Sequence, residues 1–153
     1  MNTSVLKKSP LFETFNENEL KQLESAALPV EIITGDPVFS EGSVSDALFF
    51  IQQGSVKVVK AAAQDEQAMR ELSANTVIGE LGLLDGAPRA ASVIAKENLK
   101  LIKIPYQSLE TIFEKNPAVG MKFYKRLGTI ISNRIRTTTN DLAQLKDLKL
   151  KHL

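Results

Sequence analysis

The chain has 153 residues, which is the length of one ordinary domain and too short for two folded units of typical size. Its 19 Lys and Arg nearly balance its 18 Asp and Glu, and the formal net charge of +1 provides no global field to attract nucleic acid or an anionic membrane. The sequence has no cysteine for disulfide or thiol chemistry, no signal-like run near its start and no apolar stretch long enough for a membrane span, so we expect a cytoplasmic protein with no membrane contact.

The first element in chain order is predicted to be a short helix. Asn16, followed by Glu19 three residues later, forms a variant of the capping box that opens helices. Apolar residues continue at helical spacing to Ala27, and Pro29 ends the pattern. Residues 1–28 are therefore expected to form an N-terminal helical segment.

Residues 29–105 change to short apolar runs separated by turn-forming residues. Clear examples of these runs are 48–51, 56–59 and 99–104, and glycine stands in most of the turns between runs. Strands and turns at this spacing are typical of an antiparallel sandwich or barrel. The pattern predicts about eight short strands in this segment.

Residues 106–153 return to a helical pattern. Pro105 suits the start of one helix, and Asn116 with Pro117 suits the start of a second. The residues around Thr138 are poor helix formers, which leaves two alternatives open. The helix either breaks there and folds back, or continues for roughly 50 Å, projects beyond the domain and pairs with its copy in a homodimer.

The segment that carries recognisable chemistry spans residues 77–93 and reads VIGELGLLDGAPRAASV. Small residues such as Gly79 and Ala90 let backbone N–H groups approach an anion closely. The planar guanidinium of Arg89 can donate two parallel hydrogen bonds to phosphate oxygens, and Glu80 can accept from a hydroxyl group. Taken alone, the same two charges could equally form an ordinary surface ion pair beside a glycine-rich turn.

The whole segment decides between these two interpretations, because it resembles the phosphate-binding cassette of the cyclic nucleotide-binding domain family. That family includes catabolite activator proteins and the regulatory subunits of cyclic AMP-dependent protein kinase. The resemblance lies in 79–81 (GEL) and 88–93 (PRAASV), with glycines at matching positions earlier in the chain. It implies a mainly β fold, a β-roll jelly roll or double-stranded β-helix, with an N-terminal helix and long C-terminal helices.

The resemblance also implies roles for individual residues of the cassette. Glu80 would bind the ribose 2′-hydroxyl, and Arg89 would bind the cyclic phosphate. The backbone N–H groups of Leu81 and of Ala90 or Ala91 would complete the anion site beside Gly79. Ala90 replaces a hydroxyl residue that cyclic GMP-selective members often carry, which favours cyclic AMP over cyclic GMP.

Three candidates outside the cassette are less specific. Val58 and Met69 are expected to line the base pocket from their strand positions, although plain core packing explains them equally well. Arg126 is expected to face the ligand from the C-terminal helix. The other basic residues of that helix are interpreted as solvated side chains.

We therefore expect a non-enzymatic regulatory sensor that binds a cyclic nucleotide, needs no metal or other cofactor, and signals through its C-terminal helices to an unknown protein partner. Transcription factors of this family carry a helix-turn-helix after the long helix, whereas this sequence ends at Leu153, so direct DNA binding is not expected. One alternative is a nucleotide-independent dimerising scaffold with the same fold. A metal enzyme of the cupin type is disfavoured, because the only histidine is His152.

Overall fold

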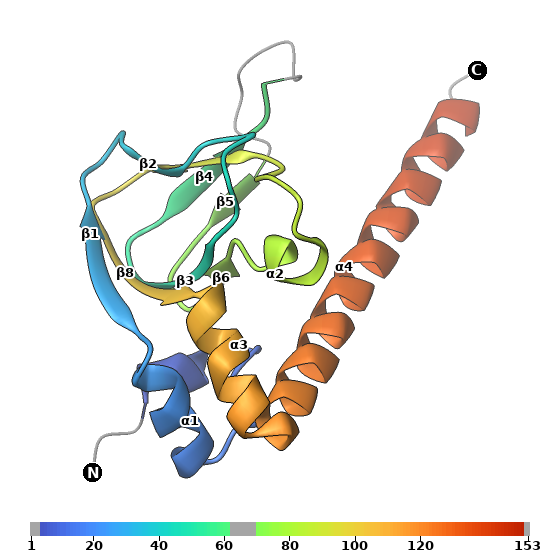
Figure 1. Cartoon of the computed structure of the whole chain (residues 1–153). Coiled ribbons are helices and arrows are strands. Elements are labelled where there is room, and N and C mark those ends of the chain that lie inside the picture. Colours follow the sequence, from blue (N-terminus) through green and yellow to red (C-terminus); the bar gives the residue numbers. More distant parts are fainter. Residues whose placement is uncertain (1–3, 62–69, 152–153) are drawn as a thin grey trace.

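The computed structural model describes residues 4–61 and 70–151. The eight strands within these residues form two four-stranded sheets, and all pairs of neighbouring strands are antiparallel. The strand orders are β1-β8-β3-β6 and β2-β7-β4-β5. The helices of residues 17–24 and 106–115 lie at one end of this β-roll with the start of the long C-terminal helix, which then extends past the sheets (Figure 1). The strands are β1 (Leu28–Ile32), β2 (Pro37–Phe39), β3 (Ala47–Gln53), β4 (Val56–Val59), β5 (Arg70–Leu72), β6 (Val77–Ile78), β7 (Ser92–Ala95) and β8 (Leu99–Pro105). The helices are η1 (Val5–Lys8), α1 (Glu17–Glu24), α2 (Leu81–Asp85), α3 (Tyr106–Lys115) and α4 (Pro117–Lys151).

The central strand β3 is buried on both faces, which explains its continuous apolar sequence. Side chains alternate along a strand, so Phe49 and Ile51 point into the core between the two sheets. Leu48 and Phe50 point the other way, into a second core beneath the helices. The predicted mainly β jelly roll with flanking helices is confirmed.

The N-terminal helix forms around the predicted capping box. The side chain of Asn16 accepts from the N–H of Glu19 at 2.9 Å, and the Glu19 carboxylate accepts from the N–H of Asn16 at 2.9 Å. The helix ends at Glu24, three residues before the predicted end at Ala27. The prediction was too long because β1 begins at Leu28 and pairs with β8, so the intervening residues must turn the chain.

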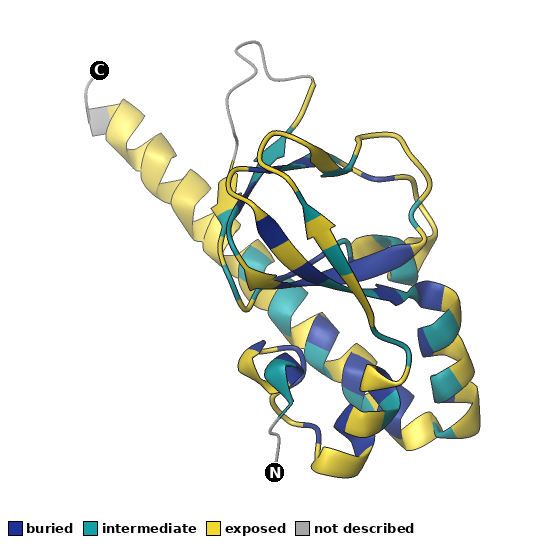
Figure 2. Cartoon of the chain, turned by 90° about the vertical axis from the view of Figure 1, so that its left-hand side faces the viewer, coloured by how far each residue is buried: buried dark blue, intermediate teal, exposed yellow. Residues whose placement is uncertain are grey.

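Helix α4 is continuous over 35 residues and is therefore about 52 Å long at 1.5 Å per residue. The alternative of a break near Thr138 is wrong. The first turns of α4 pack on α3 and the N-terminal segment, whereas residues 135–150 are all exposed (Figure 2). Packing of the first half supplies the helix nucleus, and the helix propagates from it through residues that only weakly favour a helix. In the described parts of the chain, no helix is sufficiently long and apolar to cross a membrane.

Candidate functional site

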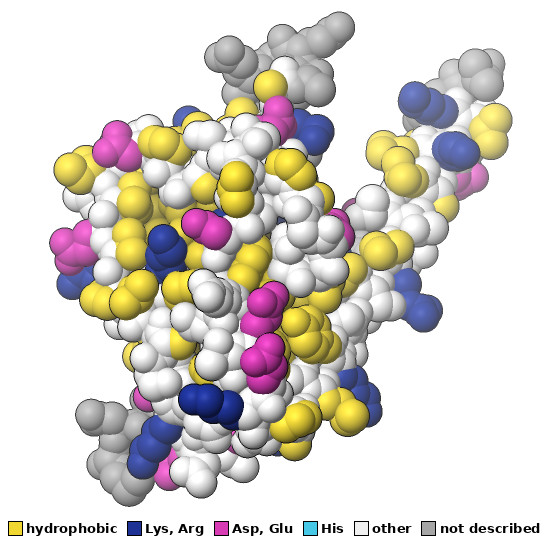
Figure 3. Space-filling view, viewed as in Figure 1, with side chains coloured by type: hydrophobic (Ala, Val, Ile, Leu, Met, Phe, Trp, Pro, Cys, Tyr) yellow, Lys and Arg dark blue, Asp and Glu magenta, His cyan; other side chains and the backbone are white. Residues whose placement is uncertain are grey.

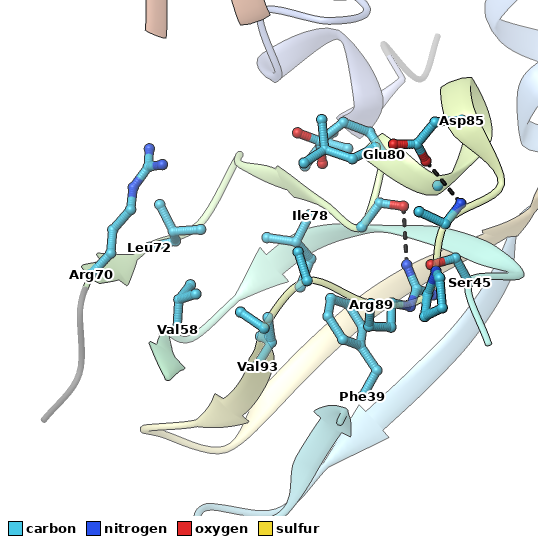
Figure 4. Close-up of a pocket in the computed structure, with 18 of the residues that line it drawn as sticks. Phe39, Ser45, Val58, Arg70, Leu72, Ile78, Glu80, Asp85, Arg89 and Val93 are labelled. Atoms are coloured by element: carbon cyan, nitrogen blue, oxygen red, sulfur yellow. Dashed lines mark hydrogen bonds between the residues drawn. The ribbon is translucent and has the colours of Figure 1, made fainter. Parts of the chain in front are cut away.

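The cassette forms one wall of a pocket of about 770 Å³, counted with its open mouth. Strands β4 and β5 form the far wall (Figure 4). Helix α4 reaches the pocket at Arg134. The pocket brings together seven of the residues expected from the sequence. They are Val58, Gly79, Glu80, Leu81, Arg89, Ala90 and Ala91.

Arg89 is held rigidly at the inner end of this pocket. Its side chain is buried, and Nη2 donates to the carbonyl of Ala47 at 2.8 Å while Nη1 donates to the carbonyl of Gly79 at 3.1 Å. The guanidinium stacks over the ring of Phe39, with 4.1 Å from Cζ to the ring centroid. The nearest carboxylate, that of Asp46, lies 3.6 Å from Nη2 and is largely exposed. The positive charge is thus fixed in place and only weakly compensated.

The Nε atom of Arg89 is buried and has no hydrogen-bond partner among the described residues. Buried polar groups are nearly always hydrogen-bonded, and leaving one unpaired costs about 1–3 kcal/mol. A buried guanidinium N–H at the end of an open pocket is therefore a donor that an incoming anion would satisfy.

Backbone donors of the cassette belong to residues that line the same pocket. In the described chain, no hydrogen bond occupies the N–H groups of Leu81, Ala90 or Ala91. The cassette that carries them is held to the β2–β3 loop by two backbone hydrogen bonds of Arg89, from the N–H of Gly42 at 2.8 Å and to the carbonyl of Ser43 at 2.9 Å. The free N–H groups therefore sit on a fixed backbone, as an anion site requires.

Tyr106, the first residue of α3, fixes the turn at Gly79. Its hydroxyl donates to the Gly79 carbonyl and accepts from Arg89 Nη1 at 3.3 Å. Burial raises the pKa of the Tyr106 hydroxyl above its ordinary value, although the nearby Arg89 charge opposes this. The hydroxyl consequently remains a donor at neutral pH.

Glu80 lies at the start of α2 and is buried. Its Oε1 accepts from Nη1 of Arg134 at 2.7 Å. Among the described residues Oε2 has no protein donor, so the carboxylate can accept a further hydrogen bond from a ligand hydroxyl. Arg134 is also the last residue of α4 up to position 150 that is even partly buried, and its ion pair with Glu80 connects the projecting helix to the cassette.

The structure places Arg126 elsewhere and corrects its expected role. Arg126 Nε donates to the carbonyl of Pro10 at 2.8 Å, and Nη2 pairs with Glu13 at 2.5 Å. Arg134 lies eight residues further along the same face, about 12 Å up the helix, and so reaches the pocket instead. The sequence predicted that a basic residue of the C-terminal helix faces the pocket, but it could not predict how far along the helix that residue lies.

Of the remaining candidates, Met69 lies outside the described residues. Sequence reasoning missed Phe39 and Tyr106, which position Arg89, and Arg70 and Leu72, which line the far wall with Val58. Nothing local marks these residues, because they come from strands and a helix that only the fold brings to the cassette.

Comparison with known proteins identifies the family. The sequence model of the cyclic nucleotide-binding domain family matches residues 29–116, which is more than half of the chain. The chain belongs to the cyclic nucleotide-binding domain family. This confirms the resemblance found in the cassette.

Individual relatives agree with this assignment. The chain is 25% identical over 142 residues to a CRP-like cAMP-activated global transcriptional regulator of Mycobacterium tuberculosis, covering 92% of this chain and 62% of the relative. It thus spans about three fifths of the length of that relative. A cyclic nucleotide-binding domain from Methylobacillus flagellatus superposes with a TM-score of 0.79 and 26% identity over 90% of this chain and 78% of that one. The cAMP-bound regulatory domain of Toxoplasma gondii protein kinase A superposes with a TM-score of 0.66 and 26% identity, over 71% and 41%.

Proposed function

We propose that this chain is a regulatory module that binds a 3′,5′-cyclic nucleotide in the pocket between the cassette and β5. Arg89 and the free N–H groups of Leu81, Ala90 and Ala91 bind the cyclic phosphate. Glu80 accepts a hydrogen bond from the ribose 2′-hydroxyl. The buried Nε of Arg89, which has no hydrogen-bond partner among the described residues, is the observation that carries this proposal.

The order of chemical groups along the pocket supports the proposal. Among the described residues, donors and a fixed positive charge stand at one end, a carboxylate with one oxygen that has no protein donor lies beside them, and the side chains toward the far wall are mostly apolar (Figure 4). A cyclic nucleotide presents an anion, a hydroxyl and a flat aromatic base in the same order. The apolar lining consists of Val58 and Leu72 on the far wall, together with Ile78 on β6 and Val93 on β7.

The preferred ligand in this proposal is cyclic AMP. Ala90 offers no hydroxyl to the 2-amino group of guanine, so it gives cyclic GMP no advantage at that point. The names of two relatives, one described as cAMP-activated and one crystallised with cAMP, point the same way. No part of the binding requires catalysis, and among the described residues no group of acidic or histidine side chains is arranged to hold a metal ion.

The proposed signal travels through α4. Arg134 joins this helix to Glu80, so the same carboxylate contacts both the ligand and the helix. Ligand binding at Glu80 would therefore stabilise one position of α4 relative to the β-roll. The exposed apolar residues further along α4 suit pairing with a second copy of the chain, and an unknown protein partner would respond to the rearrangement. That the chain does not itself bind DNA stays a prediction.

The decisive experiment is calorimetric titration of the purified chain with cyclic AMP. Native protein should bind with a micromolar or lower Kd, and Arg89→Ala should weaken binding by about tenfold or more through loss of a charge-assisted contact. Arg89→Lys keeps the charge but loses Nε and the planar fork, and should also weaken binding. The Arg89→Lys variant guards against misreading a folding defect, because Arg89→Ala removes the guanidinium hydrogen bonds to the carbonyls of Ala47 and Gly79.

Arg126→Ala is the matched control, since Arg126 is a basic residue that binds the N-terminal segment outside the pocket. Its affinity for cyclic AMP should equal that of the native chain. Unchanged affinity in both Arg89 variants would refute the site. Absence of nucleotide binding in the native chain would favour the dimerising scaffold.

A further inference from the structure

Arg70 occupies an unusual position on the edge strand β5. This strand pairs with β4, so that Arg70 lies opposite Val58 and Leu72 lies opposite Val56. Side chains two residues apart share a face of a strand, and Leu72 packs against the core between the sheets. Arg70 therefore lies on the inward face of the sheet, at the mouth of the pocket, and lines it together with Leu72 (Figure 4).

The described residues offer Arg70 no ion pair and no hydrogen bond. The adjacent Glu71 projects from the opposite face of the strand and pairs with Lys96 at 2.8 Å. The pocket residues nearest in the strand pairing, Val58 and Leu72, are apolar. Within the described parts of the chain, an exposed guanidinium thus stands without a partner at the end of the pocket that is farthest from Arg89 (Figure 4).

The chemistry of this end discriminates between purines. A guanidinium has five N–H donors and no acceptor. Guanine presents two adjacent acceptors, N7 and O6, whereas adenine presents N7 beside an N6 amino group that donates. Arginine therefore complements the 6-oxopurine edge and meets a second donor on adenine.

We propose that Arg70 recognises the base by donating to O6 and N7 of a 6-oxopurine, so that the pocket accepts cyclic GMP alongside cyclic AMP. This inference rests on the proposed function and concerns the base end of the same pocket. Arg70 opposes the preference for cyclic AMP that Ala90 confers. Selectivity is then set by two residues with opposite effects at two different atoms of the base.

Cyclic IMP is the probe that separates these effects. It carries O6 and N7 like cyclic GMP, but lacks the 2-amino group that Ala90 cannot contact. Cyclic AMP, cyclic GMP and cyclic IMP are titrated into the native chain, Arg70→Met and Arg70→Lys. Arg70→Met should weaken the affinity for cyclic GMP and for cyclic IMP by about tenfold each, and should change the affinity for cyclic AMP by less than about threefold. The affinity of Arg70→Lys for cyclic GMP and cyclic IMP should lie between those of the native chain and Arg70→Met, because lysine keeps the charge without the planar fork.

An equal loss for all three nucleotides would overturn the proposal and leave Arg70 as a general attractant for anions. No loss for any of them would also overturn it, and would favour the role of an inward-pointing charge that prevents β5 from pairing with other strands. If the native chain binds none of the three nucleotides, the proposed function itself fails. The two failures are therefore distinct results of one titration series.

Discussion

Arg89 and Gly79 show how closely the site depends on single residues. Gly79 adopts φ +77°, and a Cβ built there would lie 2.6 Å from Nη1 of Arg89 and 3.2 Å from the carbonyl oxygen of Ala47. The sequence predicted both residues from the cassette. It could not predict that Arg89 donates to Ala47, which is 42 residues away along the chain and comes close only because β3 lies beside the cassette.

Gly79→Ala should therefore damage binding more than stability. The new methyl group would displace the guanidinium, and we expect cyclic AMP affinity to fall by about tenfold or more. The left-handed backbone strain should cost about 1–2 kcal/mol of unfolding free energy. Titration calorimetry and chemical denaturation measure the two effects.

Gly35→Ala is the control for backbone strain alone. Gly35 has φ +92°, but a Cβ there would meet nothing within 4 Å. The unfolding free energy of Gly35→Ala should fall by a similar amount, whereas its affinity for cyclic AMP should equal that of the native chain. Equal affinities in the two alanine variants would show that the Gly79 contact does not position Arg89.

At the level of elements, ion pairs join α4 both to the N-terminal helix and to the cassette. Lys122 pairs with Glu19 at 2.8 Å, and Arg134 pairs with Glu80 at 2.7 Å. The first pair anchors the helix to α1, far from the pocket. The second pair connects the helix to the residue proposed to bind ribose, so it is the contact through which a ligand can influence the projecting half.

Arg134→Gln should uncouple α4 from the ligand. Because the chain has no cysteine, Glu31→Cys and Gln144→Cys introduce the only two labelling sites, one on β1 and one on α4. Spin-label distances, measured with labelled chain diluted in unlabelled chain, should change when cyclic AMP binds the native protein. In Arg134→Gln that change should disappear, and affinity should fall by about three- to tenfold.

Arg136→Gln provides the comparison, since Arg136 is exposed and lies on a different face of the same helix. It should retain both the affinity and the ligand-dependent change in distance. A full ligand-dependent change in Arg134→Gln would contradict the proposed coupling through Glu80.

For the whole molecule, the exposed half of α4 is the most conspicuous surface. Apolar side chains follow this projecting helix (Figure 3). Ile131, Ile135, Thr138, Leu142 and Leu145 alternate at spacings of four and three residues, which is the pattern of a two-stranded coiled coil. Leu142 and Leu145 are 57% and 55% exposed, so a single chain leaves the C-terminal part of this stripe uncovered, whereas Ile131 packs against the core beneath the helices.

The chain should form a two-fold dimer through this stripe. Sedimentation equilibrium should give about twice the mass of one chain for the native protein, and the mass of one chain for the double variant Leu142→Asp, Leu145→Asp. Burying four carboxylates in the seam would cost more than the packing contributes. Leu150→Asp, an exposed residue off the stripe, should remain dimeric. A native chain that stays monomeric at high concentration would refute the dimer.

The sequence by itself determined the fold class, the capped N-terminal helix and the two charged residues of the cassette. These features depend on local spacing: alternation in strands, the Asn16 cap and the residue order of 79–93. Tertiary structure alone decided that Arg134 rather than Arg126 meets Glu80, and that Arg70 lies at the pocket mouth. It also decided that α4 continues through Thr138, because packing at its base supplies the helix nucleus from which the exposed half propagates. Each of these depends on contacts between residues far apart in sequence, whose relative positions no local pattern specifies.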